Sequence, residues 1–344
     1  MNKPILVIKI GSAVITNSSG YIDEAVIERL AKEVAALHGQ YNVVLVSSGA
    51  VGSGKQFFKK YRGTLVERKA AAAVGNPILI RLYHQFFQPH GLTVAQALCE
   101  RHHFSNRQQF LQLKETFAEF WRNDVLPVVN ENDLVSNVEL KFSDNDELAT
   151  LLALGFDATA LIICTSVGGF LDDKKTVIPL VEKIDDGLLS YISTDKSSLG
   201  LGGMLSKITF TRLATSLGIK VIITGLKEPD ALRQSLVGNR GTTFLPQRSD
   251  LKARQRWLAS GSITLGGIQV DSGAAKALLL RKSLLAVGIQ HIKGSFAAGE
   301  VVQLVDESGT IIGVAKVKMD AAEIARHKTE KNALAAHADD IVLF

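Results

Sequence analysis

A short apolar run near the start of the chain reads Ile5-Leu6-Val7-Ile8-Lys9-Ile10-Gly11-Ser12. Apolar side chains on both faces are typical of a parallel strand buried between layers of helices. Five similar runs follow, separated by longer segments in which apolar residues recur at spacings of three and four, as they do on one face of a helix. This alternation predicts an α/β domain with a largely parallel central sheet.

The expected elements of this domain lie before residue 225. Strands are expected at residues 5–10, 43–46, 93–98, 126–129, 161–165 and 220–224, and helices at 23–37, 67–87, 108–121 and 207–217. After about residue 243, short β-rich pieces alternate with glycines and charged turns, which predicts a second, small β-rich domain. We therefore expect an α/β domain over residues 1–248, a polar and basic linker over 249–260, and the β-rich domain over 261–344.

Composition narrows the class of protein. The 344 residues are enough for two domains, and 46% hydrophobic with 21% charged residues is typical of a folded globular chain. No apolar run approaches the roughly 20 residues that cross a bilayer, so we expect a cytoplasmic protein. Cys99 and Cys164 each lie in an apolar stretch and predict neither a disulfide framework nor a cysteine zinc site. The net charge of +5 gives weak support for an anionic ligand.

Ligands of such sheets bind beyond the carboxyl ends of the strands, so the residues that follow each strand are candidates for the site. The first candidate is Lys9, which ends a buried strand just before the glycine turn at Gly11. A cation in this position needs a negative partner, either in the protein or in a ligand. The alternative is a lysine whose stem is buried and whose charge reaches solvent at the edge of the sheet.

The second candidate is the segment 47–55, which follows a strand and enters a helix. Its spacing from Gly49 to Lys55 fits the nucleotide-binding P-loop, but Gln56 stands where that motif needs serine or threonine for Mg²⁺. The P-loop is therefore the minor alternative. We expect instead that backbone N–H groups at Ser48, Gly49 and Ala50 face an anion.

The third candidate is an acidic cluster in two parts. Asn130, Glu131 and Asp133 come directly after a strand, and a run that includes Asp144 and Asp146 opens a helix. Six carboxylates between residues 131 and 147 repel one another unless they bind cations or ligands rich in hydrogen-bond donors. Helix capping by Ser143 or Asp144 is the alternative, and it accounts for the second part alone.

The fourth candidate is the glycine-rich run 199–207, which ends in Lys207. Glycines before a helix let the backbone approach a phosphate, and Lys207 together with Lys9 offers two lysines for phosphoryl transfer. The histidines show no metal-ligand spacing, and we expect the adjacent side chains of His102 and His103 to point apart. No metal-ligand set is assigned from the sequence.

These four segments, in this order, resemble the amino acid kinase family over essentially the whole chain, and most closely its members that phosphorylate glutamate on the side chain. The specific motifs lie at residues 7–12, 46–50, 72–75, 129–133, 144–146 and 202–204 with Lys207. Residues 261–327 resemble the PUA domain, a β-rich module first known from RNA-modifying enzymes. The resemblance implies an amino acid kinase-like sandwich around a largely parallel sheet, followed by a PUA-like domain.

The resemblance also implies roles for single residues. Lys9 and Lys207 would contact the phosphates, and Asp146 would orient both lysines. Asp144 would help to place the substrate or Mg²⁺. Glutamate would be held by Ser48, Gly49, Asn130, Asp133, Asp144 and Asn145. ATP would be bound by Lys9, Gly11, Thr165, Ser166, Leu201, Gly202, Gly203, Met204, Leu205, Ser206 and Lys207.

The implied reaction transfers the γ-phosphate of ATP, with Mg²⁺, to the side-chain carboxylate of L-glutamate, giving γ-glutamyl phosphate for proline biosynthesis. Proline as feedback inhibitor, a glutamyl phosphate reductase as partner and a homo-oligomer are further expectations of the resemblance. Three residues depart from the family. Ser166 stands where the family usually has aspartate, and Leu201 and Leu205 stand where it commonly has threonine or serine.

Three alternatives stay open from the sequence. In the first, the chain phosphorylates another acceptor of the family, such as aspartate, acetylglutamate, carbamate or UMP. The PUA-like domain could make the chain an RNA-binding protein, although residues 271–344 hold nine Lys plus Arg and nine Asp plus Glu, so they lack the positive charge that RNA binding favours. A degenerate kinase that serves as a binding or regulatory subunit is the third.

Overall fold

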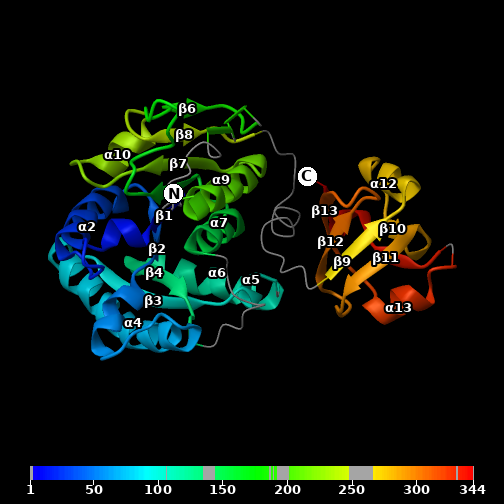
Figure 1. The fold of residues 1–344 in the computed structure, drawn as a ribbon, viewed down its shortest axis with the longest axis horizontal. Coiled ribbons are helices and arrows are strands. Elements are labelled where there is room, and N and C mark those ends of the chain that lie inside the picture. The colour runs from blue at the N-terminus through cyan, green and yellow to red at the C-terminus, as the bar shows by residue number, and fades with distance from the viewer. Residues whose placement is uncertain are drawn as a thin grey trace. The chain divides into compact units, whose positions relative to one another are not determined.

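The structure is a computed structural model that describes residues 3–105, 107–134, 144–185, 187, 188, 190, 191, 201–247, 266–330 and 332–343. The chain forms two compact units, one of residues 1–100 with 111–249 and the other of residues 101–110 with 250–344 (Figure 1). The expected linker, residues 249–260, lies outside the described residues. The two units are therefore taken separately.

The first unit is built on one eight-stranded sheet with the order β3-β4-β2-β1-β5-β7-β8-β6. All neighbours from β3 to β7 pair in parallel, whereas β8 runs antiparallel to β7 and parallel to β6. This confirms the predicted largely parallel sheet. The strands are β1 (Ile5–Ile10), β2 (Asn42–Ser47), β3 (Thr93–Cys99), β4 (Val125–Glu131), β5 (Ala160–Cys164), β6 (Leu180–Val181), β7 (Lys220–Thr224) and β8 (Thr242–Phe244).

Helices pack on this sheet. The longer ones are α2 (Glu24–His38), α4 (Leu65–Phe87), α6 (Arg107–Arg122), α7 (Asn145–Gly155) and α9 (Leu201–Ser216). The short ones are α1 (Ser12–Ile15), α3 (Ala50–Gly54) and α10 (Ala231–Leu236), whereas α5 (His102–Ser105) belongs to the second unit. Local signals set two of the starts. Asp23 caps α2, and Thr64 with Glu67 forms a capping box at α4, because these side chains satisfy N–H groups that the first helical turn leaves unpaired.

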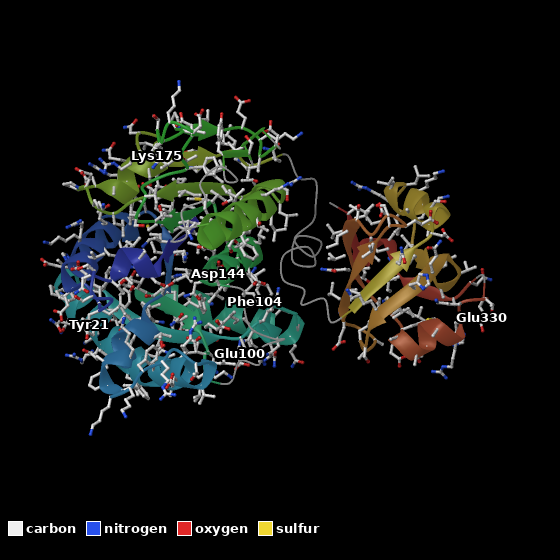
Figure 2. All side chains as sticks on the ribbon, in the orientation of Figure 1. Tyr21, Glu100, Phe104, Asp144, Lys175 and Glu330 are labelled. Atoms are coloured by element: carbon white, nitrogen blue, oxygen red, sulfur yellow. The ribbon has the colours of Figure 1, made fainter. Side chains whose placement is uncertain are left out.

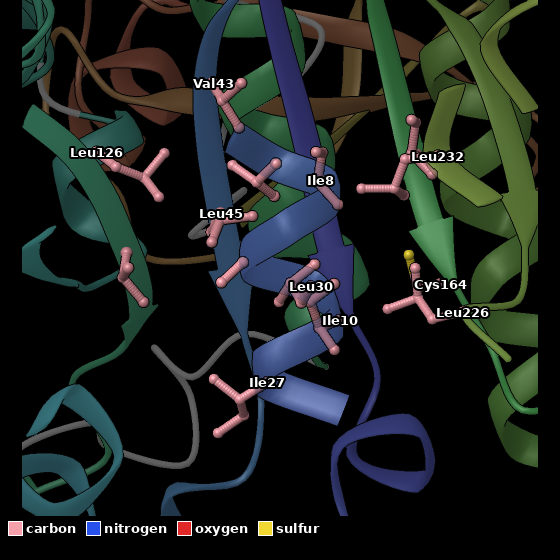
Figure 3. Close-up of a cluster of buried hydrophobic side chains, with 14 of the residues drawn as sticks. Ile8, Ile10, Ile27, Leu30, Val43, Leu45, Leu126, Cys164, Leu226 and Leu232 are labelled. Atoms are coloured by element: carbon pink, nitrogen blue, oxygen red, sulfur yellow. The ribbon is translucent and has the colours of Figure 1, made fainter. Parts of the chain in front are cut away.

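One buried hydrophobic cluster lies on one face of the sheet. Side chains at alternate strand positions point to the same face, and Leu6, Ile8 and Ile10 of β1 pack with apolar residues of α2, α4 and α10 in one buried cluster. Figure 3 shows Ile8 and Ile10 of this cluster beside Leu30 of α2. Lys9 has the opposite parity, and α7 packs against β1 on that second face. The alternation of β1 thus puts one lysine among α7 and its neighbour α9.

The second unit contains a five-stranded sheet with the order β11-β9-β12-β13-β15 and a two-stranded pair, β10 with β14. Its strands are β9 (Gly266–Val270), β10 (Leu284–Leu285), β11 (Ile289–Gly294), β12 (Val301–Val305), β13 (Ile311–Lys316), β14 (Leu334–Ala336) and β15 (Ile341–Leu343), and its helices include α12 (Ser272–Leu279) and α13 (Ala321–Arg326). A separate apolar cluster within residues 268–341 forms its core. The expected β-rich C-terminal domain is confirmed.

Candidate active site

Two lysines from distant parts of the chain meet at one carboxylate. Lys9 Nζ lies 2.6 Å from Asp146 Oδ1, and Lys207 Nζ lies 2.9 Å from Asp146 Oδ2. Lys9 is the last residue but one of β1, Asp146 lies in the first turn of α7, and Lys207 lies in the second turn of α9. Two ammonium groups on one buried carboxylate leave a local charge of about +1, which favours an anionic ligand.

Asp144 fixes the start of α7 against α9. Its Oδ1 accepts hydrogen bonds from the backbone N–H groups of Asp146, at 2.9 Å, and Glu147, at 3.1 Å, while its Oδ2 accepts one from the Ser206 hydroxyl. The capping alternative is therefore correct for Asp144, which also lines the cavity described below. Figure 2 labels Asp144 where α7 begins. Because Ser206 and Lys207 are adjacent, this bond also helps to place the second lysine.

The ends of β2 and β4 meet α7 through Asn145. Its Nδ2 donates to the backbone oxygen of Ser47 at 3.0 Å, to Ser48 Oγ at 3.2 Å and to Asn130 Oδ1 at 3.1 Å. The carbonyl of Ser47 can only accept, so the atom of Asn145 that faces it must be the nitrogen. The amide oxygen of Asn145 then remains as an acceptor, and Ser48, which already accepts, can donate its own proton.

The turn at Gly49 is only partly as expected. Gly49 has φ 108°, and a Cβ there would lie 2.9 Å from Ile22 Cδ1, so glycine is required. The backbone N–H of Ser48 donates to Ile10 O within the sheet. The expectation that this N–H faces an anion is wrong, because pairing of β1 with the residue after β2 uses it.

The P-loop reading fails on packing. A Cβ on Gly54 would lie 1.9 Å from Ala71 O of α4, so this glycine serves a close contact between two helices. The next residue, Lys55, has its Nζ 5.8 Å from the centroid of the Tyr21 ring. Helix α3 also has five residues only. The P-loop-like spacing therefore has a structural explanation.

One cavity of about 740 Å³ joins these groups. Cys164 also borders it, but burial raises the pKa of that thiol, which makes a thiolate nucleophile unfavourable there. The expected site residues that line the cavity are Lys9, Gly11, Ser48, Gly49, Asn130, Asp133, Asp144, Asn145, Asp146, Thr165, Ser166, Met204 and Lys207.

The glycine-rich run differs from the expectation in its backbone. Helix α9 begins at Leu201, six residues before the predicted start, so Gly202 and Gly203 are helical rather than part of a loop. The side chains of Leu201 and Leu205 lie outside the described part of the chain. Their contribution to nucleotide binding, and that of the two glycines, stays a prediction.

The cavity also has lining residues that the sequence did not indicate. Gly20, Tyr61 and Arg68 are among them, and so is Lys55, which attracted notice only through the P-loop spacing. Tyr61 and Arg68 flank the start of α4 and do not directly follow a strand. The expectation that ligands bind beyond the carboxyl ends of strands therefore could not indicate them. No signal in the sequence distinguished these two from ordinary surface residues.

The described residues show neither a metal-ligand cluster nor a membrane-spanning helix. In the described ranges, no group of three or more His, Cys, Asp or Glu residues could hold a metal ion, and no helix is long and apolar enough to span a bilayer. The rings of His102 and His103 have centroids 4.2 Å apart. The expectation that they point apart is wrong, because both lie in the single turn of α5 and their rings tilt toward each other.

The fold and the paired lysines at the end of a parallel sheet identify a class of phosphotransferases. The chain belongs to the amino acid kinase family, whose model matches residues 4–225, and the PUA domain model matches residues 266–337. It is 38% identical over 337 residues to the glutamate 5-kinase of Moorella thermoacetica, covering 95% of this chain and 89% of that protein. It is 39% identical over 328 residues to the glutamate 5-kinase of Aquifex aeolicus, covering 94% and 92%.

A solved structure supports the fold. The carbamate kinase from Giardia lamblia bound to AMP-PNP matches with a TM-score of 0.52 and 19% identity, covering 71% of this chain and 99% of that one. At this identity the likeness shows the fold alone.

Proposed function

We propose that this chain is an ATP-dependent glutamate 5-kinase, which transfers the γ-phosphate of ATP to the side-chain carboxylate of L-glutamate. The observation that carries the proposal is the convergence of Lys9 and Lys207 on Asp146 beside a cavity whose wall also presents Asn145 and Asp133. The relatives named glutamate 5-kinase cover nearly the whole chain. One end of the cavity therefore suits phosphate, and the amide and carboxylate groups suit an amino acid.

The attacking group needs no general base. A glutamate side chain has a pKa of about 4.3, so it is already a carboxylate at neutral pH. The barrier arises from bringing this anion to a triphosphate. Lys9 and Lys207, held in place by Asp146, would neutralise charge on the transferring phosphoryl group without having to reorganise. Asp146 itself is a positioning group, because its two oxygens are occupied by the lysines.

The acceptor would be held by complementary polar groups. The amide oxygen of Asn145 and the carboxylate of Asp133 are acceptors suited to an α-ammonium group, and the Ser48 hydroxyl is a donor suited to a carboxylate. Asn130 acts on Asn145 through its hydrogen bond. Such fixation favours in-line attack because it replaces a bimolecular encounter with a bound, oriented pair.

Mg²⁺ fits this site as an ion that enters with ATP. The described residues offer no cage of protein ligands, and Mg²⁺ usually takes one or two carboxylates together with phosphate oxygens and water. Asp133 and Asp144 line the cavity and are the carboxylates that would approach it. When bound, the ion would neutralise charge on the phosphates.

The finer assignments belong to the same proposal. The product, γ-glutamyl phosphate, is a reactive acyl phosphate, so an enzyme that reduces it is the natural partner, on the route to proline. We include proline as a feedback inhibitor, a homo-oligomer, a cytoplasmic location and domain limits of 1–248 and 261–344.

A chemical trap tests the proposal directly. The purified chain with glutamate, MgATP and hydroxylamine should yield a hydroxamate, because hydroxylamine intercepts an acyl phosphate. Parallel reactions with aspartate, acetylglutamate, carbamate and UMP, followed by ADP release, separate the other acceptors of the family. Absence of hydroxamate with glutamate, in a sample that releases ADP with another acceptor, would remove the proposed substrate.

A further inference from the structure

A buried asparagine on α4 lies behind the proposed acceptor pocket. Asn76 is 8% exposed and does not belong to the described lining of the cavity. Its Oδ1 accepts a hydrogen bond of 3.2 Å from Asn130 Nδ2. Asn130 in turn is 6% exposed and accepts from Asn145 Nδ2 at 3.1 Å. Three amides from α4, β4 and α7 thus form one chain that ends in the cavity.

Backbone groups fix the direction of this chain. The backbone N–H of Glu131 donates to Asn130 at 2.9 Å, so the atom of Asn130 that receives it must be the oxygen. The nitrogen of Asn130 must then point to Asn76, which has to present an acceptor. At the other end, the Ser47 carbonyl fixes the nitrogen of Asn145. Only one arrangement of the amides satisfies both ends.

Asn76 therefore decides whether Asn130 can keep its orientation. Without an acceptor at residue 76, the buried Nδ2 of Asn130 loses its only protein partner in the described chain. Turning the amide over would instead place that nitrogen against two donors, the Glu131 N–H and Asn145 Nδ2. Keeping the orientation leaves a buried unsatisfied donor on Asn130, which is costly. Turning the amide over removes one of the three acceptors around Asn145 Nδ2.

We propose that Asn76 is a positioning residue for the amino acid acceptor, which it orients through Asn130 and Asn145 without touching it. The inference rests on the proposed function, since it assigns the acceptor to the side of the cavity that Asn145 faces. It separates binding of the acceptor from stabilisation of the transferred phosphoryl group. The acceptor side depends on Asn76, whereas Lys9, Lys207 and Asp146 are held by contacts that do not involve it.

The test compares Asn76→Leu with Asn76→Asp. Leucine has the same number and branching of side-chain heavy atoms but no acceptor. We expect the KM for glutamate to rise by about tenfold or more, with kcat and the KM for ATP within about twofold of wild type. Aspartate keeps an oxygen at the same place, and we expect it to restore most of the affinity. A rise in both KM values together, or an unchanged glutamate KM in folded Asn76→Leu, overturns the proposal.

Tyr83→Phe is the matched control. Tyr83 lies on the same helix, is fully buried, and bonds to Ser47 Oγ at 2.8 Å, outside the amide chain. This variant should lose stability while the glutamate KM stays unchanged. If Asn76→Leu does not fold, Asn76→Gln replaces it, because the longer side chain displaces the oxygen. Equal glutamate KM values for Asn76→Gln and Asn76→Asp would then contradict the proposal.

The proposed function can fail independently. If wild type makes no hydroxamate from glutamate, the same variants are compared with the acceptor that wild type does phosphorylate. A second readout needs no substrate at all. In the ligand-free protein, NMR should show slow exchange for the side-chain amide protons of Asn130 in wild type and Tyr83→Phe, and fast exchange in Asn76→Leu. Slow exchange in Asn76→Leu would overturn the inference by itself.

Discussion

Lys9 and Lys207 lie far apart in the sequence, yet each forms an ion pair with one oxygen of Asp146. Asp146 has a side chain that is 1% exposed, so the pair of cations is held in a region of low dielectric. Charge prepared in this way stabilises a developing anion more strongly than solvent can. The arrangement makes Lys207 the clearest residue for a catalytic test.

We expect Lys207→Ala to lower kcat by about 100-fold or more, because removal of one preorganised donor to a reacting oxyanion commonly costs that much. Steady-state rates from the hydroxamate assay measure the change. Lys32→Ala is the control, since Lys32 is an exposed lysine that pairs with Glu28 on α2. Near-normal turnover in folded Lys207→Ala would contradict the role given to this lysine.

His38 gives a prediction about pH. Burial lowers its pKa below the ordinary value of 6.5, nearby Lys3 acts in the same direction, and Asp124, 3.6 Å away, opposes them. The unfolded chain therefore binds this proton first as the pH falls. The contribution of His38 to the free energy of unfolding is complete above about pH 6.5 and declines as the pH drops toward the folded-state pKa.

Urea unfolding at pH 8 and pH 5.5 measures this effect. Wild type should lose more stability between the two values than His38→Gln, which cannot titrate at this position. Other groups titrate in both proteins. The relevant quantity is therefore the change in the free energy of unfolding between the two pH values, which is one slope for each protein, and the difference between these two slopes. Identical slopes would mean that His38 has the same pKa in the folded and unfolded chains.

At the scale of elements, α3 and α4 cross with almost no space between their backbones. A Cβ on Gly75 would lie 1.8 Å from Ala50 O and 2.8 Å from Gly54 N. The contact holds α3 at the position where its first residue, Ala50, follows the turn at Gly49 beside the cavity. In the proposal, helix α4 therefore supports the acceptor pocket twice, through this crossing and through Asn76.

Gly75→Ala should destabilise the chain by about 2 kcal/mol or more, because an added methyl group with no space must displace α3. Thermal and urea unfolding measure the loss, and the glutamate KM should rise as α3 moves. Gly39→Ala is the matched control, since Gly39 has φ −64° and no atom lies within 4 Å of the added Cβ. That variant should be neutral or slightly stabilising. Equal stability of the two variants would show that α3 can relax freely.

The sequence predicted the elements that bear long apolar patterns. The bounds of β1 and β7 agree with the prediction, and those of β2 to β5 differ from it by at most two residues at either end. Strands β6 and β8 were missed because they have only two and three residues, too few to show the alternation of apolar and polar side chains that marks a strand. Helix α9 was predicted too short, since Gly202 and Gly203 favour a loop by local propensity.

The site was predictable only where a residue follows a strand or matches a motif. Lys9, Asp146 and Lys207 carry such signals, although their catalytic roles stay predictions. Asn76 carries none. It lies within an alanine-rich helix, and its partner Asn130 is 54 positions away. Tertiary packing alone brings the two amides together.

At the scale of the whole molecule, the two units have separate apolar cores. The net charge is also distributed unevenly along the sequence. Residues 271–344 contain equal numbers of basic and acidic side chains, so the entire net charge of +5 belongs to residues 1–270. That distribution concerns the rival reading in which the PUA domain makes this chain an RNA-binding protein.

Nucleic-acid affinity depends strongly on neutralising phosphates with Lys and Arg, and the slope of log K against log salt is about −0.9Z for Z neutralised phosphates of B-form DNA and about −0.7Z for single strands. With no net positive charge in residues 271–344, we expect the chain to bind tRNA no more tightly than about 10⁻⁵ M at physiological salt, in the range of non-specific binding. Fluorescence anisotropy at 50 mM and 200 mM salt, with labelled tRNA and with MgATP present to occupy the cationic cavity, measures both quantities. Binding in the nanomolar range, with a salt slope of several units, would show that local clusters of Lys and Arg outweigh the neutral total and would make RNA a second ligand of this kinase.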